Sequence, residues 1–167
     1  TTTGHPWAGH VLYTFTGQTD GMVPWAGLTW HSGNLYGAAT AGGVSGPNGG
    51  GTVFELTPSD AGWTFNLIYS FPGWGISGTY RDLYIDKSGN IWATTHCDGA
   101  DTDGTVYELS PPTSGSTWTY TLLWDITDTD DGYYLHTNLV FDQQGNLYGT
   151  AEMGGQDGFG TVFKVTP

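Results

Sequence analysis

Two aspartate-rich loops carry the residue pattern most suggestive of chemistry. Both end on a glycine, and their carboxylates belong to Asp101, Asp103, Asp128, Asp130 and Asp131. Calcium takes about six to eight oxygen ligands, and closely spaced carboxylates before a glycine turn supply several of them. Neither loop has the full spacing of an EF-hand or its closing glutamate, and aspartate and glycine are also ordinary turn residues. The sequence indicates no cofactor apart from this calcium hypothesis.

A second group of side chains could bind a transition metal or take part in catalysis: His96, Cys97, Asp98 and His136. Neighbouring residues of a strand point to opposite faces, which argues against one metal shared by His96 and Cys97. No third group that would orient a Cys–His nucleophile pair can be identified. We favour buried or hydrogen-bonded histidines, and we assign no catalytic residue.

Tryptophans in or beside long loops are candidates for stacking on the apolar face of a sugar. Trp25 and Trp74 are the two in such positions, whereas Trp7, Trp63 and Trp118 recur in register and are expected to pack between repeats. The predicted ligand-binding set on the loop face is Asp20, Trp25, Trp74, His96, Asp98 and His136.

A repeat positions these residues. A Gly-Asn pair followed by an apolar and an aromatic residue begins at Gly33, Gly89 and Gly145, at a constant interval of 56 residues. Such a pattern predicts a turn that leads into a strand, and a fixed interval indicates a repeat architecture. The 167 residues form a single repeat domain, with repeats over about 5–58, 59–111 and 112–167.

Each repeat of about 55 residues contains four short apolar segments typical of strands. Four-stranded antiparallel units repeated radially are the blades of a β-propeller. We therefore predict an all-β propeller with three four-stranded blades, and a sandwich of twelve short strands is the alternative. The long D-to-A and B-to-C loops, which join the fourth strand to the next first strand and the second to the third, should share one face.

The order of the predicted strands suggests how a ring could close. The chain opens on a fourth strand, 11–15, and closes on first, second and third strands, 139–165. Three blades are fewer than the usual ring of about four to eight. We expect residues 11–15 to complete the third blade of another copy, which gives a six-bladed homodimer. The alternatives are a nine-bladed trimer or a fragment of a longer propeller.

The charge excludes several partners. The formal net charge is −13, with 3 basic and 16 acidic residues. Nucleic-acid binding needs a basic patch that this chain cannot build, and an anionic membrane surface is disfavoured for the same reason. No apolar run has the length of a membrane span. The acidic, lysine-poor composition fits a protein secreted from a bacterium or held on its surface.

The repeat resembles a known family. The residues that carry the resemblance are Gly-Asn-Leu-Tyr-Gly-Thr at 145–150 and Gly-Thr-Val-Phe-Lys-Val-Thr-Pro at 160–167. They are similar to the GloVer tandem repeat of secreted or surface-anchored bacterial proteins. The resemblance implies a β-propeller and carries no activity over to this chain.

The favoured function is a non-enzymatic extracellular interaction or scaffold module that binds glycans or cations on its acidic loop face. The first alternative is a carbohydrate-active hydrolase or lyase that uses loop carboxylates, since glycoside cleavage needs two carboxylates across a cleft. The second is a propeller fragment or engineered repeat unit without a function of its own.

Overall fold

The computed structural model describes residues 7–73, 75 and 77–167. They form three antiparallel sheets, with one short 3-10 helix, η1 (Gly46–Asn48). Sheet 1 has the strand order β1–β2–β3–β4, with β1 (Thr29–His31), β2 (Asn34–Ala39), β3 (Thr52–Ser59) and β4 (Gly62–Ser70). Sheet 2 has the order β5–β6–β7–β8, with β5 (Tyr84–Ile85), β6 (Ile91–Thr94), β7 (Thr105–Ser110) and β8 (Thr119–Asp125). Sheet 3 contains β9 (Val140–Phe141), β10 (Leu147–Ala151) and β11 (Thr161–Val165), with β10 in the middle.

The prediction of an all-β fold is confirmed. Each sheet takes its first three strands from one repeat, and sheets 1 and 2 take their fourth strand, β4 or β8, from the next repeat. Sheets 1 and 2 have the expected four strands in sequence order, and sheet 3 has three. The strand predicted at residues 11–15 pairs with no strand of the described residues, and because its predicted neighbour belongs to another copy, it stays a prediction. A strand needs a neighbour to take up its backbone N–H and C=O groups, and residues 11–15 have none here.

The turn between the first two strands explains the recurring Gly-Asn pair. In repeat 2 the Asp86 carboxylate accepts hydrogen bonds from the Asn90 backbone N–H at 3.0 Å and from its side-chain amide at 2.9 Å. Asp142 holds Asn146 in the same way in repeat 3, at 2.9 and 2.6 Å. In each turn the intervening glycine has a positive φ, which a residue without a Cβ adopts at little cost. These turns fix the register of the two strands they join.

Two hydrophobic clusters hold the sheets together. The first lies between sheets 1 and 2 and includes Phe71, Ile91, Tyr107 and Leu109. The second lies between sheets 2 and 3, and its fully buried members include Ile126 and Leu135. The cores are therefore interfaces between sheets, as expected where each repeat has too little apolar surface to fold alone.

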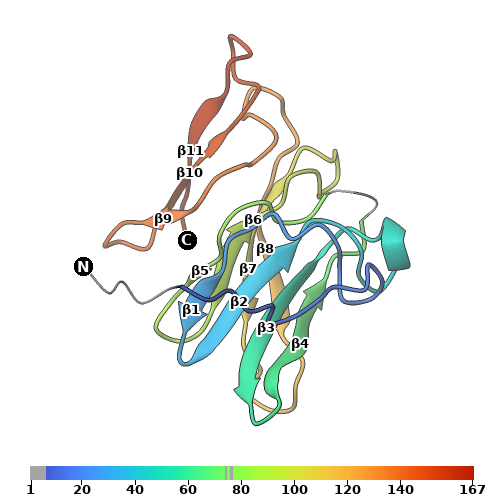
Figure 1. The fold of residues 1–167 in the computed structure, drawn as a ribbon. Helices are drawn as coiled ribbons and strands as arrows, with labels where there is room; N and C mark the ends of the chain where they lie inside the picture. Colours follow the sequence, from blue (N-terminus) through green and yellow to red (C-terminus); the bar gives the residue numbers. More distant parts are fainter. Residues whose placement is uncertain (1–6, 74, 76) are drawn as a thin grey trace, which may run out of the picture.

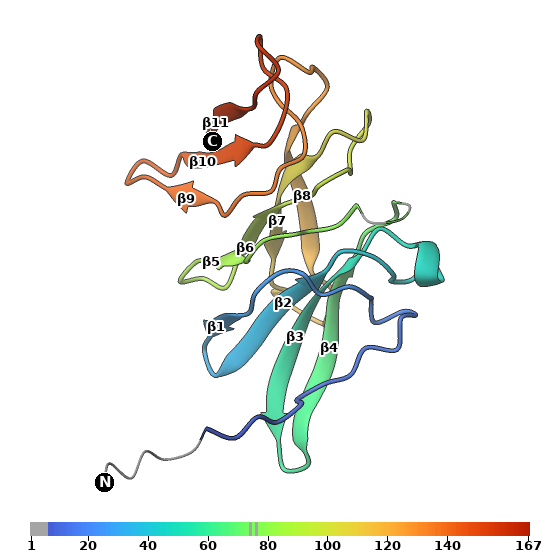
Figure 2. The same ribbon diagram turned by 45° about the horizontal axis from the view of Figure 1, so that its top comes forward.

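The three sheets follow one another in a row, and β1, β5 and β9 lie along the same side, here called the inner side (Figures 1 and 2). Hydrogen bonds cross from sheet to sheet along it. The Gly27 N–H donates to the Asp82 carboxylate at 2.8 Å, and the Asp82 N–H donates to the Asn138 side-chain oxygen at 3.2 Å. These three residues occupy equivalent positions, one before the leucine that opens each inner strand segment. The inner side is thus built by repetition of one contact.

Candidate functional site

Three rings line up at the start of the inner side. Trp25, Tyr80 and His136 stand at equivalent positions, three residues before the leucines at 28, 83 and 139. The centroids of Trp25 and Tyr80 are 5.1 Å apart in an edge-to-face contact, and those of Tyr80 and His136 are 4.7 Å apart in a stack. One residue from each repeat therefore contributes to a continuous row.

The row is positioned by loops that meet at one end of the sheets. The Thr40 N–H donates to the Val23 carbonyl at 3.1 Å, and the Glu152 N–H donates to the Tyr134 carbonyl at 3.2 Å. Equivalent bonds run from the His96 N–H to the carbonyls of residues 77 and 78. In each repeat, the loop before the first strand is thus hydrogen-bonded to the loop after the second strand. The prediction that these loops share one face is confirmed.

Backbone strain marks the same place. Val23 and Tyr134 have φ values of 59° and 60°, which side chains with a Cβ rarely adopt. In each case the next residue but one, Trp25 or His136, donates its N–H back to the strained residue's carbonyl at 2.9 Å. These bonds close a tight turn directly before Trp25 and before His136. Strain of this kind tends to be kept where a site needs it.

Two further rings join the row in repeats 2 and 3. His96 stacks on His136 at 4.4 Å between centroids and contacts Tyr134 at 4.4 Å. Glu152 completes the group, because its carboxylate lies 2.8 Å from Nδ1 of His136. We call Trp25, Tyr80, His96, Tyr134, His136 and Glu152 the rim cluster.

The electrostatics of the rim cluster favour a neutral His96. Burial lowers the pKa of His96 to about 4, the neighbouring His136 adds to the effect, and Glu152 opposes it. Nδ1 of His96 and Nε2 of His136 are buried and have no hydrogen-bond partner among the described residues. Each nitrogen keeps an unused hydrogen-bonding capacity, but because both atoms are buried, a ligand hydroxyl reaches them only after a neighbouring side chain moves.

A pocket opens beside the row. Its volume is about 310 Å³, and it is lined by Trp25, Tyr80, Arg81 and His136. Arg81 is held over it, since its Nε donates to the His136 carbonyl at 3.3 Å. The tryptophan side chain is 62% exposed, so much of its ring is open to a ligand.

The structure brings together three residues of the predicted ligand-binding set: Trp25, His96 and His136. Asp20 is not among them, because it is 8% exposed and its carboxylate accepts hydrogen bonds from its own chain. Asp98 lies elsewhere, near Tyr69, Tyr107 and Tyr120, and burial raises its pKa. Trp74 lies outside the described residues.

The five aspartates proposed for calcium do not converge. Across residues 7–73, 75 and 77–167, no group of three or more His, Cys, Asp and Glu side chains is placed to hold a metal ion. Asp128 accepts the Asp130 N–H at 3.0 Å, which is the local role of an aspartate in a turn. The calcium hypothesis stays a prediction without support from this geometry.

Sequence reasoning missed four residues of this site: Tyr80, Arg81, Tyr134 and Glu152. A signal for two of them was present, because Tyr80 is equivalent to Trp25 and Glu152 to His96. Residue types recur across the repeats at few loop positions, so comparison by type does not show these two. A row built from three different residue types at one position escapes such a comparison.

A scan against models of protein families found no match, and a search of curated proteins found none either. The resemblance to the GloVer repeat therefore stays a prediction. None of the helices in the described part of the chain is long and apolar enough to cross a membrane.

Proposed function

We propose that the chain is a non-enzymatic interaction module of an extracellular β-propeller, and that its rim cluster binds neutral glycans. In this proposal the three sheets are three blades, and a second copy completes a six-bladed ring. The observation that carries the binding proposal is the row of rings from three repeats beside a pocket of about 310 Å³.

The chemistry of the rim matches that of a sugar. The exposed Trp25 ring offers an apolar face to the C–H groups of a pyranose. His96 and His136 each keep one unpartnered ring nitrogen, and the carboxylate of Glu152 is 57% exposed. Hydroxyl groups both donate and accept hydrogen bonds, so they can use acceptors and donors of this kind together.

The charges favour a neutral ligand over an anionic one. The chain carries a formal net charge of −13, which repels polyanions at low ionic strength. Arg81 and the neutral His96 do not make a cationic site. Secretion fits the acidic composition and is part of the proposal.

Two features favour binding over turnover. Glu152 is the one carboxylate in the rim cluster, whereas glycoside cleavage by acid and base needs a pair. Burial and the nearby Asp103 raise the pKa of the Cys97 thiol, so the thiolate required of a nucleophile is disfavoured. The hydrolase or lyase alternative stays a prediction, and incubation with a polysaccharide panel tests it by released reducing ends.

The binding proposal is tested with a glycan array, followed by calorimetric titration with the best neutral oligosaccharide. We expect Trp25→Ala to weaken binding about tenfold or more, because it removes the stacking face. Trp30→Ala is the matched control, since Trp30 on β1 is 63% exposed and outside the rim cluster. Equal losses in both variants, or no neutral glycan bound by the parent chain, would overturn the proposal.

A further inference from the structure

Residues 11–15 contact sheet 1 in the same way that the end of β4 contacts sheet 2. The rings of Phe15 and Phe54 have centroids 5.2 Å apart and planes at 71°. Those of Phe71 and Tyr107, at equivalent positions between sheets 1 and 2, have centroids 5.3 Å apart and planes at 71°. The N-terminal segment thus makes a contact that, elsewhere in the molecule, belongs to a fourth strand.

A second pair of rings repeats the match. Tyr13 stacks on Phe65 at 4.6 Å with an interplanar angle of 19°. Tyr69 stacks on Tyr120 at 5.0 Å with an angle of 13°. Relative to sheet 1, residues 11–15 therefore occupy the place of a fourth strand from a preceding blade.

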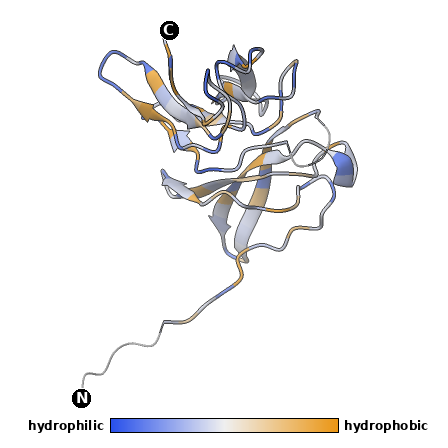
Figure 3. Cartoon of the chain, turned by 90° about the horizontal axis from the view of Figure 1, so that it is seen from above, coloured by the Kyte–Doolittle hydropathy of each residue, from blue (hydrophilic) through white to orange (hydrophobic). Residues whose placement is uncertain are grey.

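The backbone of this segment is nevertheless unpaired. Residues 7–16 belong to no strand of the described chain, and side-chain bonds to Asp20 hold the segment in place. Several of its side chains are open to water although they are apolar: Trp7 is fully exposed and Val11 is 84% exposed. Figure 3 shows hydrophobic colour along this part of the chain before the first sheet. A segment with an apolar surface and a free backbone edge is ready to pair.

The complementary edge lies on sheet 3. In sheet 1 the fourth strand is tied by the Phe71 N–H, which donates to the Gly51 carbonyl at 3.0 Å. In sheet 2 the Ile126 N–H donates to the Gly104 carbonyl at 3.2 Å. The equivalent acceptor in sheet 3 is the carbonyl of Gly160, which has no such partner among the described residues.

A hydrogen bond between a loop N–H and a fourth-strand side chain is also present in sheets 1 and 2 and missing in sheet 3. Ser70 accepts the Val44 N–H at 2.9 Å in sheet 1, and Asp125 accepts the Ala100 N–H at 3.1 Å in sheet 2. The equivalent donor in sheet 3 is the N–H of Gln156, and the side chain equivalent to Ser70 is that of Thr14. Within the described residues nothing takes the place of Ser70 at sheet 3.

We propose that residues 7–15 of one chain form the fourth strand of sheet 3 in a second copy, antiparallel to β11. This inference rests on the propeller architecture proposed above and names its partner. The β3–β4 and β7–β8 pairs both have a register shift directly after the Thr-Val pair of β3 or β7. Applying the same register to β11 and residues 7–15 gives the pairing. Thr14 then pairs with Thr161, Tyr13 with Val162 and His10 with Lys164.

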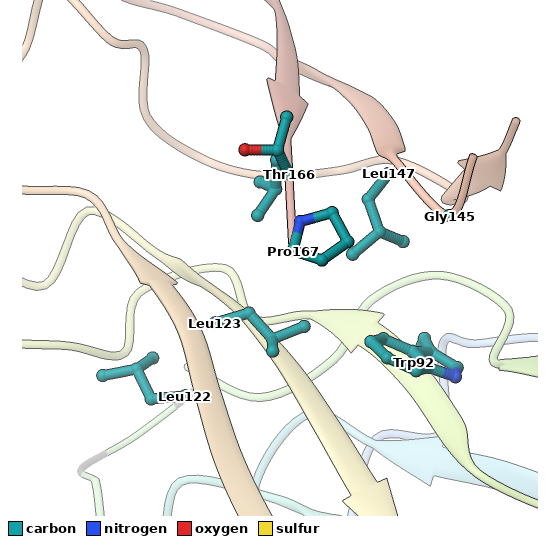
Figure 4. A pocket seen from close by; sticks show the side chains of 8 residues that line it. Trp92, Leu122, Leu123, Gly145, Leu147, Thr166 and Pro167 are labelled. Atoms are coloured by element: carbon teal, nitrogen blue, oxygen red, sulfur yellow. The ribbon is translucent and has the colours of Figure 1, made fainter.

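The same register places Trp7 opposite Pro167, where a pocket is found. Figure 4 shows this pocket of about 240 Å³ between sheets 2 and 3, with Leu123 and Trp92 facing Leu147 and Pro167. At the equivalent place between sheets 1 and 2, Trp118 packs against the core. The fully exposed Trp7 of the second copy has the matching position, so it fills this pocket.

The partner is a second copy because the chain's own segment lies at the far end of the row. Figure 2 shows residues 7–15 beside sheet 1 and sheet 3 beyond sheet 2. Within the described residues, every chain offers one unpaired segment, residues 7–15, and one sheet without a fourth strand, so two chains satisfy each other twice under two-fold symmetry. The exchange also places the first sheet of each copy beside the third sheet of the other. The row of rim rings would then continue from one chain to the next.

Light scattering on a sizing column is the first test. We expect twice the chain mass of 17.9 kDa. Trp7→Ala should raise the dimer dissociation constant about tenfold or more, because it removes the largest side chain of the exchanged segment. Since Trp7 is fully exposed in the single chain, the variant leaves the fold of each copy intact. Lys87→Ala, in the exposed turn between β5 and β6 of the middle sheet, is the control and should not change the mass.

A disulfide tests the register. In a Cys97→Ser background, His10→Cys with Lys164→Cys should give a dimer band on non-reducing gels that a reductant removes. His10→Cys with Lys87→Cys is the control, because Lys87 lies in the turn between β5 and β6 and not on the free edge. A monomer or trimer mass, a ladder of larger species, or equal cross-linking in the control would overturn the proposal.

The two proposals fail separately. Loss of glycan binding with an intact dimer would remove the rim function and leave the exchange. A monomer that still binds glycans through Trp25 would remove the exchange and leave the function. Both readouts are taken on the same unmodified chain.

Discussion

The contact between sheets 1 and 2 and the contact between sheets 2 and 3 are built from equivalent positions, yet they are not equally complete. In the first, the rings of Tyr69, Phe71, Tyr107 and Tyr120 form a closed group with centroid distances of 5.0 to 6.3 Å. At the equivalent positions of the second contact, Trp124 and Phe163 meet at 5.1 Å, Ile126 stands in place of Phe71, and no ring of the described chain stands in place of Tyr120. The other rings between these sheets lie on β5, β6 and β9, where Phe141 meets Tyr84 at 4.6 Å and Trp92 at 5.2 Å. The first contact has a fourth strand on both of its sheets, and the second has one on sheet 2 alone.

The difference teaches what a fourth strand does in this molecule. It covers the end of the interface away from the long loops, where Trp118 lies between sheets 1 and 2. Between sheets 2 and 3 that place is a pocket of about 240 Å³. The strand therefore completes a core that two sheets share, as well as a sheet.

The largest expected effect compares a buried ring in each contact. Tyr107→Ala should lower the free energy of unfolding by about 4 kcal/mol, because Tyr107 is fully buried and its hydroxyl lies 2.7 Å from that of Thr79. Phe163→Ala should cost about 2 kcal/mol, since the incompletely covered site can relax around the smaller side chain. Urea unfolding in a Trp7→Ala background measures both, at a protein concentration where light scattering gives the single-chain mass of 17.9 kDa.

The order of the two losses is the informative result. Equal losses would mean that the second contact is as tightly packed as the first and that sheet 3 lacks nothing. Tyr107→Phe serves as a control, because it keeps the ring and removes the hydroxyl alone. Its loss should be about 1 kcal/mol.

The arrangement of strands was predictable because the same turn and strand segments recur in each repeat. Gly-Asn turns, the Gly-Thr-Val segments of β3, β7 and β11, and the prolines after them each recur at an equivalent place in all three repeats. The strand predicted at 11–15 is unpaired in the single chain for a physical reason. Its sequence is that of a strand, but pairing depends on a neighbour that local sequence does not supply.

The site was predictable in part. Trp25, His96 and His136 were chosen by residue type, and the structure places all three in the rim cluster. Asp20 was chosen by type as well, yet its carboxylate is used up by its own chain. Type alone cannot tell a carboxylate that faces a ligand from one that holds a turn, because both occur in polar loops.

Asp20 tests how the N-terminal segment is held on sheet 1. Burial acts to raise the pKa of Asp20, but hydrogen bonds from Thr16, Tyr13 and Gln18 outweigh it and lower the pKa to about 2. The unfolded group titrates near 3.8, so its contribution is present above that pH and is lost as the pH falls toward 2. Asp20→Asn should cost about 2 kcal/mol at neutral pH and remove this acid dependence.

The measurement is thermal or urea unfolding between pH 5 and pH 2, taken on the parent chain and on the variant. Asp60→Asn is the control, because Asp60 is exposed and lies in the turn between β3 and β4. An unchanged acid profile in Asp20→Asn would show that the N-terminal segment is not held by this carboxylate. The ring contacts of Tyr13 and Phe15 with sheet 1 would then be what holds the segment there.

The smallest expected effect concerns His96. This histidine belongs to the rim between sheets 2 and 3, whereas the equivalent residue of repeat 1 is Thr40, so the two contacts differ at this position. The folded chain binds a proton on His96 near pH 4, whereas the unfolded chain binds it near pH 6.5. Unfolding therefore takes up a proton between these values, so stability falls as the pH drops from 6.5 to 4 and is not reduced further by this group below that. Because water still reaches part of the ring, the loss should be about 1–2 kcal/mol.

His96→Gln isolates this contribution in the presence of its titrating neighbours His136, Glu152, Tyr80, Tyr134 and Cys97. The variant keeps a polar side chain and cannot take up a proton in this range. Its free energy of unfolding should vary less between pH 6.5 and pH 4 than that of the parent chain. An identical slope would show that His96 does not carry the proton uptake, and the stack at the rim of sheets 2 and 3 would then not depend on a neutral His96.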